Sequence, residues 1–131
     1  MSKKVILCVD DEKIILNSLK VQLKEEFGSS YVYETAENAS DAEELIEEMI
    51  EDGCQILVIV SDWLMPGVKG DEFLIKIHKK HPQIVKIMLS GHVSQEAITR
   101  AVNEANLHKC LSKPWSNEDL IETIKEGLKK I

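Results

Sequence analysis

Five short apolar segments recur along the chain at nearly constant intervals, and this rhythm constrains the fold more than any other feature. Their starts lie 23 to 28 residues apart, and the segments are Val5–Val9, Tyr31–Ala36, Ile56–Val60, Ile84–Leu89 and Leu107–Leu111. Each has the length of a β-strand, and each is followed by apolar residues at helical spacing, such as Leu16, Leu19 and Leu23. The pattern predicts five consecutive strand–helix units.

Alternating strands and helices predict an α/β protein, in which helices cover both faces of a parallel sheet. The segments Ile6–Leu7 and Ile56–Val60 are continuously apolar, as strands buried on both faces are. We therefore expect a doubly wound, five-stranded parallel sheet of the (βα)5 type. In such sheets ligands bind beyond the carboxyl ends of the strands, so functional residues are expected there.

Turn and capping residues fall at the borders of these units. Ser40 and Glu43 have the spacing of a capping box, which predicts that a helix begins at Ser40. Gly28 and Gly53 follow helical segments, where a left-handed residue closes a helix well. Pro82 is expected to end the third helix, because the residue before a proline is biased away from helical geometry.

The composition excludes secreted and membrane classes. The chain has 131 residues, of which 44% are hydrophobic and 30% charged, the profile of a single globular domain. Its longest apolar run, Ile56–Val60, is far shorter than the roughly 20 residues of a membrane helix. Three cysteines, without a CxxC pair, predict neither a disulfide framework nor a zinc site. We expect a cytoplasmic protein that does not contact a membrane.

The net charge of −7 is unevenly distributed. Residues Glu34–Asp52 contain nine acids and no lysine or arginine, which leaves 14 acids against 16 bases elsewhere. An acidic run of this kind is typical of a solvated helix face. Because phosphate contacts need a basic patch, we do not expect this domain to bind nucleic acid directly.

The predicted strand ends carry acids, a hydroxyl group and a lysine. Asp10 and Asp11 follow the first strand, Asp62 the third, Ser90 the fourth and Lys113 the fifth. In the predicted sheet these side chains converge in one crevice. One lysine does not neutralise three neighbouring carboxylates, whereas a divalent cation does. Oxygen ligands without histidine or cysteine favour Mg²⁺ or Mn²⁺ over zinc.

Four motifs at these ends together resemble the receiver domain of bacterial two-component response regulators. They are Val5–Glu12, Ser61–Gly67 with Gly70, Met88–Gly91 and Leu111–Trp115. As an ordered set the motifs are specific, and the resemblance extends over nearly the whole chain. It implies a flavodoxin-like fold with strand order 2-1-3-4-5. It also implies a single receiver domain over residues 1–131, with no output domain in this chain.

The resemblance assigns chemical roles to the residues at the strand ends. Asp62 matches the aspartate that accepts a phosphoryl group. Lys113 matches the lysine that pairs with that group, and Ser90 matches the hydroxyl that turns toward it. Such chemistry depends mostly on positioning and charge neutralisation, because the transition state of phosphoryl transfer is loose.

The same resemblance implies a magnesium site. Asp11 matches the direct ligand, and Asp10 the acid that reaches the ion through water. Asp62 itself and the backbone carbonyl of Leu64 complete the implied set. Mg²⁺ is the expected cofactor, and Mn²⁺ is a possible replacement.

Partners also follow from the resemblance. The implied phosphodonor is a sensor histidine kinase or a phosphotransfer protein. The face of the fourth helix, fifth strand and fifth helix is the implied contact for an output domain or partner protein. The chain is expected to be a signalling phosphoprotein, and not an enzyme, that assists its own phosphorylation and dephosphorylation.

The sequence departs from the common receiver pattern near the fifth strand. Cys110 occupies a position where receivers usually have a tyrosine or phenylalanine that rotates when the hydroxyl group moves. We therefore expect the loop 91–94 and the start of the fourth helix to respond to phosphorylation, with little change at Cys110. The Lys113–Pro114 peptide is expected to be cis, as it usually is in similar receivers.

Three alternative functions have other requirements. A flavodoxin-like electron carrier needs a hydroxyl- and glycine-rich phosphate loop after the first strand, where this chain has Asp10-Asp11-Glu12-Lys13. A Mg²⁺-dependent phosphatase with an aspartate nucleophile generally has Asp-x-Asp there, which Val9-Asp10-Asp11 does not match. A phosphorylation-independent scaffold would not need the complete set of acids, hydroxyl and lysine.

Overall fold

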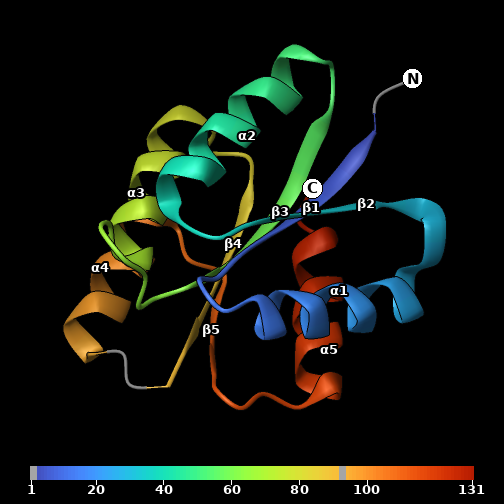
Figure 1. The fold of residues 1–131 in the computed structure, drawn as a ribbon. Coiled ribbons are helices and arrows are strands. Elements are labelled where there is room, and N and C mark those ends of the chain that lie inside the picture. The colour runs from blue at the N-terminus through green and yellow to red at the C-terminus, as the bar shows by residue number, and fades with distance from the viewer. Residues whose placement is uncertain (1–2, 92–93) are drawn as a thin grey trace.

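A computed structural model describes residues 3–91 and 94–131, which form one five-stranded sheet with five α-helices (Figure 1). All strands are parallel and their order is β2-β1-β3-β4-β5, which confirms the predicted fold. The elements in chain order are β1 (Lys4–Val9), α1 (Lys13–Phe27), the 3₁₀ turn η1 (Gly28–Ser30), β2 (Val32–Ala36), α2 (Ala39–Glu51), β3 (Gln55–Asp62), α3 (Gly70–Lys80), β4 (Val85–Ser90), α4 (Gln95–Ala105), β5 (Lys109–Ser112) and α5 (Asn117–Leu128).

Helices cover both faces of the sheet, and each face has its own core. α1 and α5 lie on one side, and α2, α3 and α4 lie on the other (Figure 1). Alternate residues of β1 supply both cores: Leu7 packs with the α2–α4 side and Ile6 with the α1–α5 side. This two-sided burial explains the continuously apolar strands. In the described residues, no helix is both long enough and apolar enough to cross a membrane.

The strand register brings the polar strand ends to one edge of the sheet. Val9 lies opposite Ser61, Asp62 opposite Leu89, and Ser90 opposite Ser112. The ends of β1, β3, β4 and β5 therefore stand level with one another. The residues that follow each strand emerge on the same side, as predicted.

Of the four predicted helix borders, three are confirmed and one is wrong. Gly28 and Gly53 have φ values of +62° and +85°, in the left-handed region that favours glycine. The capping box at Ser40 does not form, because α2 already begins at Ala39. Asn38 caps it instead: its backbone is extended, and its Oδ1 accepts a hydrogen bond from the Asp41 N–H at 2.8 Å.

The border at Pro82 is also confirmed, because α3 ends at Lys80, two residues earlier. The remaining differences concern where strands begin. β2 begins at Val32 instead of Tyr31, because the chain first completes the 3₁₀ turn η1. β5 begins at Lys109, and Leu107 is buried in the turn before it. The predicted responsive loop 91–94 includes residues 92 and 93, which lie outside the described residues.

Candidate functional site

A pocket of about 520 Å³ lies at the carboxyl edge of the sheet. It is formed where β1, β3, β4 and β5 end, which is the position predicted for a ligand site. Its lining consists of Asp11, Glu12, Asp62, Trp63, Leu64, Met65, Pro66, Ser90, Gly91 and Lys113. Four of the predicted site residues thus share one pocket with Leu64, and Asp10 lies immediately beneath them through its contact with Lys113.

Three carboxylates meet at this edge. Oxygen atoms of Asp10, Asp11 and Asp62 all lie within 4.8 Å of one another. Asp10 is completely buried and Asp62 is 5% exposed, whereas Asp11 is open to solvent. Two of these acids are therefore withdrawn from water, and the third is accessible to an entering cation.

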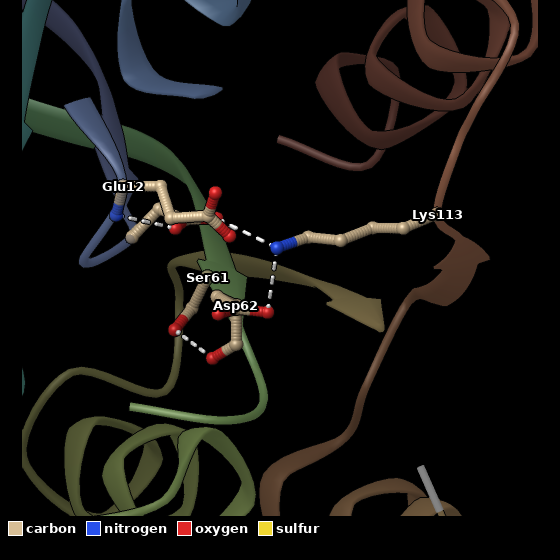
Figure 2. A network of polar contacts seen from close by, with 5 residues as sticks. Glu12, Ser61, Asp62 and Lys113 are labelled. Carbon is tan, nitrogen blue, oxygen red and sulfur yellow. Dashed lines mark hydrogen bonds and ion pairs between the residues drawn. The ribbon is translucent and has the colours of Figure 1, made fainter. Parts of the chain in front are cut away.

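Lys113 reaches in from the end of β5 and bridges two of the acids. Its Nζ lies 2.9 Å from Asp10 Oδ2 and 3.0 Å from Asp62 Oδ1 (Figure 2). The other Asp10 oxygen accepts a hydrogen bond from the Glu12 N–H at 2.9 Å. The Lys113–Pro114 peptide that follows is cis, as predicted. Asp10 is thus held from both sides, by the start of α1 and by β5.

Burial and charge shift the pKa values of the central pair. Burial raises the pKa of Asp62, and the charges of Asp10 and Asp11 add to this, although the hydrogen bond from Lys113 acts in the opposite direction. For Lys113, burial alone would lower the pKa. Its hydrogen bonds to Asp10 and Asp62 outweigh this effect, so the pKa of Lys113 is raised. The lysine is therefore charged at neutral pH.

Ser90 and Asp10 stand at the ends of β4 and β1, the two strands that flank β3 in the sheet. Ser90 is buried at the end of β4 and lines the pocket. Its backbone carbonyl accepts a hydrogen bond from the Lys113 N–H at 2.8 Å. This bond connects the end of β4 to the residue that bridges the acids. Leu64 lies on the loop after β3, with an exposed side chain.

The backbone at Asp62 is held closely by its neighbours. The Trp63 N–H donates to the Leu89 carbonyl at 2.9 Å, and the Trp63 carbonyl accepts from the Gly70 N–H at 2.7 Å. Ser61 Oγ donates to the Asp62 carbonyl at 3.0 Å (Figure 2). A Cβ atom at Gly70 would overlap the Asp62 carbonyl, so only glycine fits there.

Sequence reasoning missed a polar network beside the pocket. The buried carboxylate of Asp71 accepts a hydrogen bond from Trp63 Nε1 at 3.0 Å and one from Arg100 at 2.9 Å. Asp71 follows a helix-starting glycine, where an acid is expected merely to complement the helix dipole. Arg100 stands 29 positions further along the chain. Nothing in the spacing of these residues indicates that they meet.

Cys110 lies in β5 opposite Met88 of β4. Its side chain is half-buried and packs against the core on the α2–α4 side. Burial raises the pKa of its thiol, so the group is uncharged at neutral pH. Cys110 is therefore a small packing residue at the position where the sequence lacks an aromatic ring.

The structure thus combines a doubly wound parallel α/β sheet with a lysine-bridged acidic cluster at its carboxyl edge. Comparison with known proteins is more specific, because the response regulator receiver domain family matches residues 6–125. The chain belongs to this family. The family assignment predicted from the four motifs is thereby confirmed.

Individual relatives agree with this assignment. The chain is 34% identical over 123 residues to the hydrogenase transcriptional regulatory protein HoxA of Cupriavidus necator, covering 94% of this chain but 24% of HoxA. It is also similar to a CheY-like receiver domain from Methanospirillum hungatei, with 35% identity, a TM-score of 0.86 and coverage of 98% and 96% of the two chains. The beryllofluoride-activated NtrC4 receiver domain dimer has 33% identity, a TM-score of 0.83 and coverage of 96% and 97%. The chain thus spans about a quarter of HoxA and nearly all of these two receivers.

Proposed function

We propose that the protein is a phosphorylation-dependent signalling receiver that accepts a phosphoryl group on Asp62. The observation that carries this proposal is the position of the Lys113 ammonium, which lies 2.9 Å from Asp10 and 3.0 Å from Asp62. This lysine places a positive charge beside a nucleophilic carboxylate in a pocket open to solvent. Such an arrangement suits the neutralisation of a phosphoryl group on Asp62.

In the proposed reaction Asp62 is the nucleophile. One of its oxygens forms a bond to the phosphorus atom of the donor, and the bond between phosphorus and the leaving group breaks. When the donor is a phosphohistidine, the bond that breaks joins nitrogen to phosphorus, and the released imidazole takes up a proton. Lys113 pairs with one phosphoryl oxygen and Ser90 donates a hydrogen bond to another. Attack of water on the phosphorus later releases inorganic phosphate and restores the carboxylate.

The acidic cluster has the chemistry of a magnesium site. Its carboxylate oxygens lie within 4.8 Å of one another, and hard oxygen ligands are those that Mg²⁺ prefers. Asp11, Asp62 and the Leu64 carbonyl would hold the ion directly, and Asp10 would reach it through water; Mn²⁺ could replace it. When bound, the ion supplies positive charge to the phosphoryl oxygens.

The proposal includes partners and a location. A sensor histidine kinase or phosphotransfer protein supplies the phosphoryl group, and the face of α4, β5 and α5 contacts an output domain or partner protein. Residues 1–131 act as one receiver domain, which does not bind nucleic acid itself and assists its own phosphorylation and dephosphorylation. We place it in the cytoplasm, where the three free cysteines would remain reduced.

Phosphorylation of the purified protein tests the proposal. Incubation with Mg²⁺ and acetyl phosphate should add one phosphoryl group, measured by intact-protein mass spectrometry. Asp62→Asn keeps the size of the side chain but removes the nucleophile, so this variant should not be modified. Glu12→Gln, in the same pocket, is the matched control and should be modified normally. Modification of Asp62→Asn at the parent rate would overturn the assignment, and an unmodified parent would favour a phosphorylation-independent scaffold.

A further inference from the structure

The network of Trp63, Asp71 and Arg100 connects the loop after β3 with two helices. Asp71 lies in the first turn of α3 and is 2% exposed. One of its oxygens accepts from Trp63 Nε1 at 3.0 Å and the other from Arg100 at 2.9 Å. A buried carboxylate is strongly destabilised when it loses a charged partner, so these contacts resist separation.

One end of the network is attached to the phosphoacceptor strand. Trp63 follows Asp62 directly, and hydrogen bonds to Leu89 and Gly70 hold both its N–H and its carbonyl. The ammonium of Lys69 lies 4.9 Å from the centre of the Trp63 ring, a cation–π distance. With ring and backbone both held, a displacement of the chain at Asp62 also displaces the indole N–H that binds Asp71.

The other end of the network is attached to α4, a helix with a shallow core contact. α3 and α4 lie side by side (Figure 1). Arg100 on α4 forms an ion pair with Asp71 on α3. The buried residues of α4 are Ala97, Ala101 and Ala105, which have the smallest side chains that still provide a packing surface. Because alanine buries little apolar area, the ion pair of Arg100 with Asp71 adds a polar contact to the limited apolar packing of these alanines and Ile98; the Arg100 side chain itself is 47% exposed.

We propose that Asp71 and Arg100 are positioning residues that couple the Asp62 site to α4 through the indole of Trp63. This inference rests on the proposed phosphorylation of Asp62. The network offers a direct connection from β3 to α4 that does not pass through β5. In a chain with Cys110 in place of an aromatic ring, it provides a second path from the pocket to the surface. Coupling of this kind works in both directions between two sites.

Amide NMR spectra with and without Mg²⁺ and beryllofluoride, a phosphoryl mimic, test the coupling. In the parent we expect shifts at Asp62, Ser90 and Lys113 and along α4. Arg100→Met should keep the response in the pocket but lose the response of α4. Arg100→Lys restores a positive charge and should recover part of it.

Two further variants serve as a control and as a substitute for Arg100→Met. Lys76→Met breaks the exposed ion pair of Lys76 with Glu43, 3.0 Å apart between α3 and α2, and should leave both responses intact. Trp63→Phe keeps an aromatic ring but removes the indole N–H together with its five-membered ring, and it replaces Arg100→Met should that variant fail to fold. Loss of the α4 response in Trp63→Phe is then the expected result.

The outcomes separate this inference from the proposed function. A parent-like α4 response in Arg100→Met, or in Trp63→Phe when it stands in, would overturn the coupling. A parent with pocket shifts but no α4 response would overturn it as well, while leaving the phosphoacceptor assignment intact. A parent without any response at Asp62, Ser90 or Lys113 would overturn the proposed function, and with it this inference.

Discussion

The acidic cluster at the carboxyl ends of the strands and the α4–β5 edge of the sheet are built in opposite ways. In the cluster, Asp10 is fully buried and both of its oxygens have partners. In the α4–β5 edge, formed by Gln95–Ala105 and Lys109–Ser112, the helix buries alanines and the edge strand buries Leu111. A rigid centre suits the positioning of a reaction, whereas a lightly packed edge suits a change of shape.

The acidic cluster is held together by paired buried charges, whereas the α4–β5 edge is held by small apolar contacts. Buried charges are stable only while each partner stays in place, so the cluster tolerates little movement. A helix that packs through alanines is held in place weakly. Burial of a larger aliphatic side chain contributes about 1.5–3 kcal/mol, and burial of an alanine contributes less. A change at the cluster therefore has larger consequences for stability than a comparable change at the edge.

The largest effect is expected from Lys113→Met. This change leaves Asp10 and Asp62 without the ammonium that lies 2.9 Å and 3.0 Å from them. Loss of one partner from a buried pair typically costs about 3–5 kcal/mol, and we expect about 3 kcal/mol here because the pocket is open to solvent. Urea unfolding in EDTA measures the change, and Mg²⁺ should recover part of it.

Lys125→Met is the control for the removal of a lysine. Lys125 forms an exposed ion pair with Glu26 at 3.2 Å, at the surface between α5 and α1. Exposed pairs contribute about 0–1 kcal/mol, so this variant should be nearly as stable as the parent. Equal losses of stability in the two lysine variants would contradict the special contribution of Lys113 to the acidic cluster.

The second prediction concerns Mg²⁺. Repulsion among Asp10, Asp11 and Asp62 destabilises the metal-free fold, and an ion bound only by the folded state offsets it. At a concentration a hundredfold above its Kd, the ion adds about 2.7 kcal/mol to the free energy of unfolding. Thermal melts with and without Mg²⁺ measure the gain, and Asp11→Ala should abolish it.

Glu44→Ala separates binding at this site from general attraction of cations. Glu44 is exposed in the acidic segment Glu34–Asp52 on α2, away from the pocket. This variant should keep the full response to Mg²⁺. If Asp11→Ala responded as strongly as Glu44→Ala, the proposed role of Asp11 as a ligand would be lost.

A smaller effect concerns pH and strand β4, which lies between β3 and β5 in the sheet. Lys86 is buried; its Nζ donates to the Ile84 carbonyl at 2.7 Å and lies 2.9 Å from His78 Nδ1. Burial lowers the pKa of Lys86 to about 8. Since the unfolded chain binds the proton more tightly, the contribution of Lys86 to stability should rise as the pH increases through 8.

The pH effect is measured as a difference between the parent and Lys86→Met. From neutral pH to about pH 9.5 we expect the parent to gain about 1 kcal/mol relative to the variant. The comparison is needed because burial also raises the pKa of the Cys8 thiol to about 12, which opposes the gain at alkaline pH. A constant difference across this range would show that Lys86 is charged in the folded protein at pH 9.

The fold could be predicted because each strand–helix unit is encoded by a short, contiguous stretch of sequence. Each apolar strand and the helical spacing after it can be recognised within about 25 residues of the chain. The predicted start of α2 is wrong because two good capping residues, Asn38 and Ser40, stand close together in the sequence. Only the extended backbone of Asn38 in the structure shows which of them caps the helix.

The candidate site was predictable only in part. Asp10, Asp62, Ser90 and Lys113 come together because parallel strand ends coincide, a rule that needs no side-chain detail. The pair of Asp71 and Arg100 depends on how α3 and α4 pack, which the hydrophobic pattern does not specify. Contacts between helices on the same face of a sheet are therefore what sequence reasoning misses here.

The smallest effect is expected at Cys110 when Asp62 is occupied. A ligand shifts a two-state element only as far as its contacts differ between the two states, and a thiol packed against the core offers few such contacts. Beryllofluoride with Mg²⁺ should therefore shift the amide signals of Gly91 and Ser94 strongly and that of Cys110 weakly. Cys110→Ser, nearly equal in size, should leave this pattern unchanged. A strong, coupled shift at Cys110 would mean that β5 responds without an aromatic ring, and that α4 and β5 move as one unit.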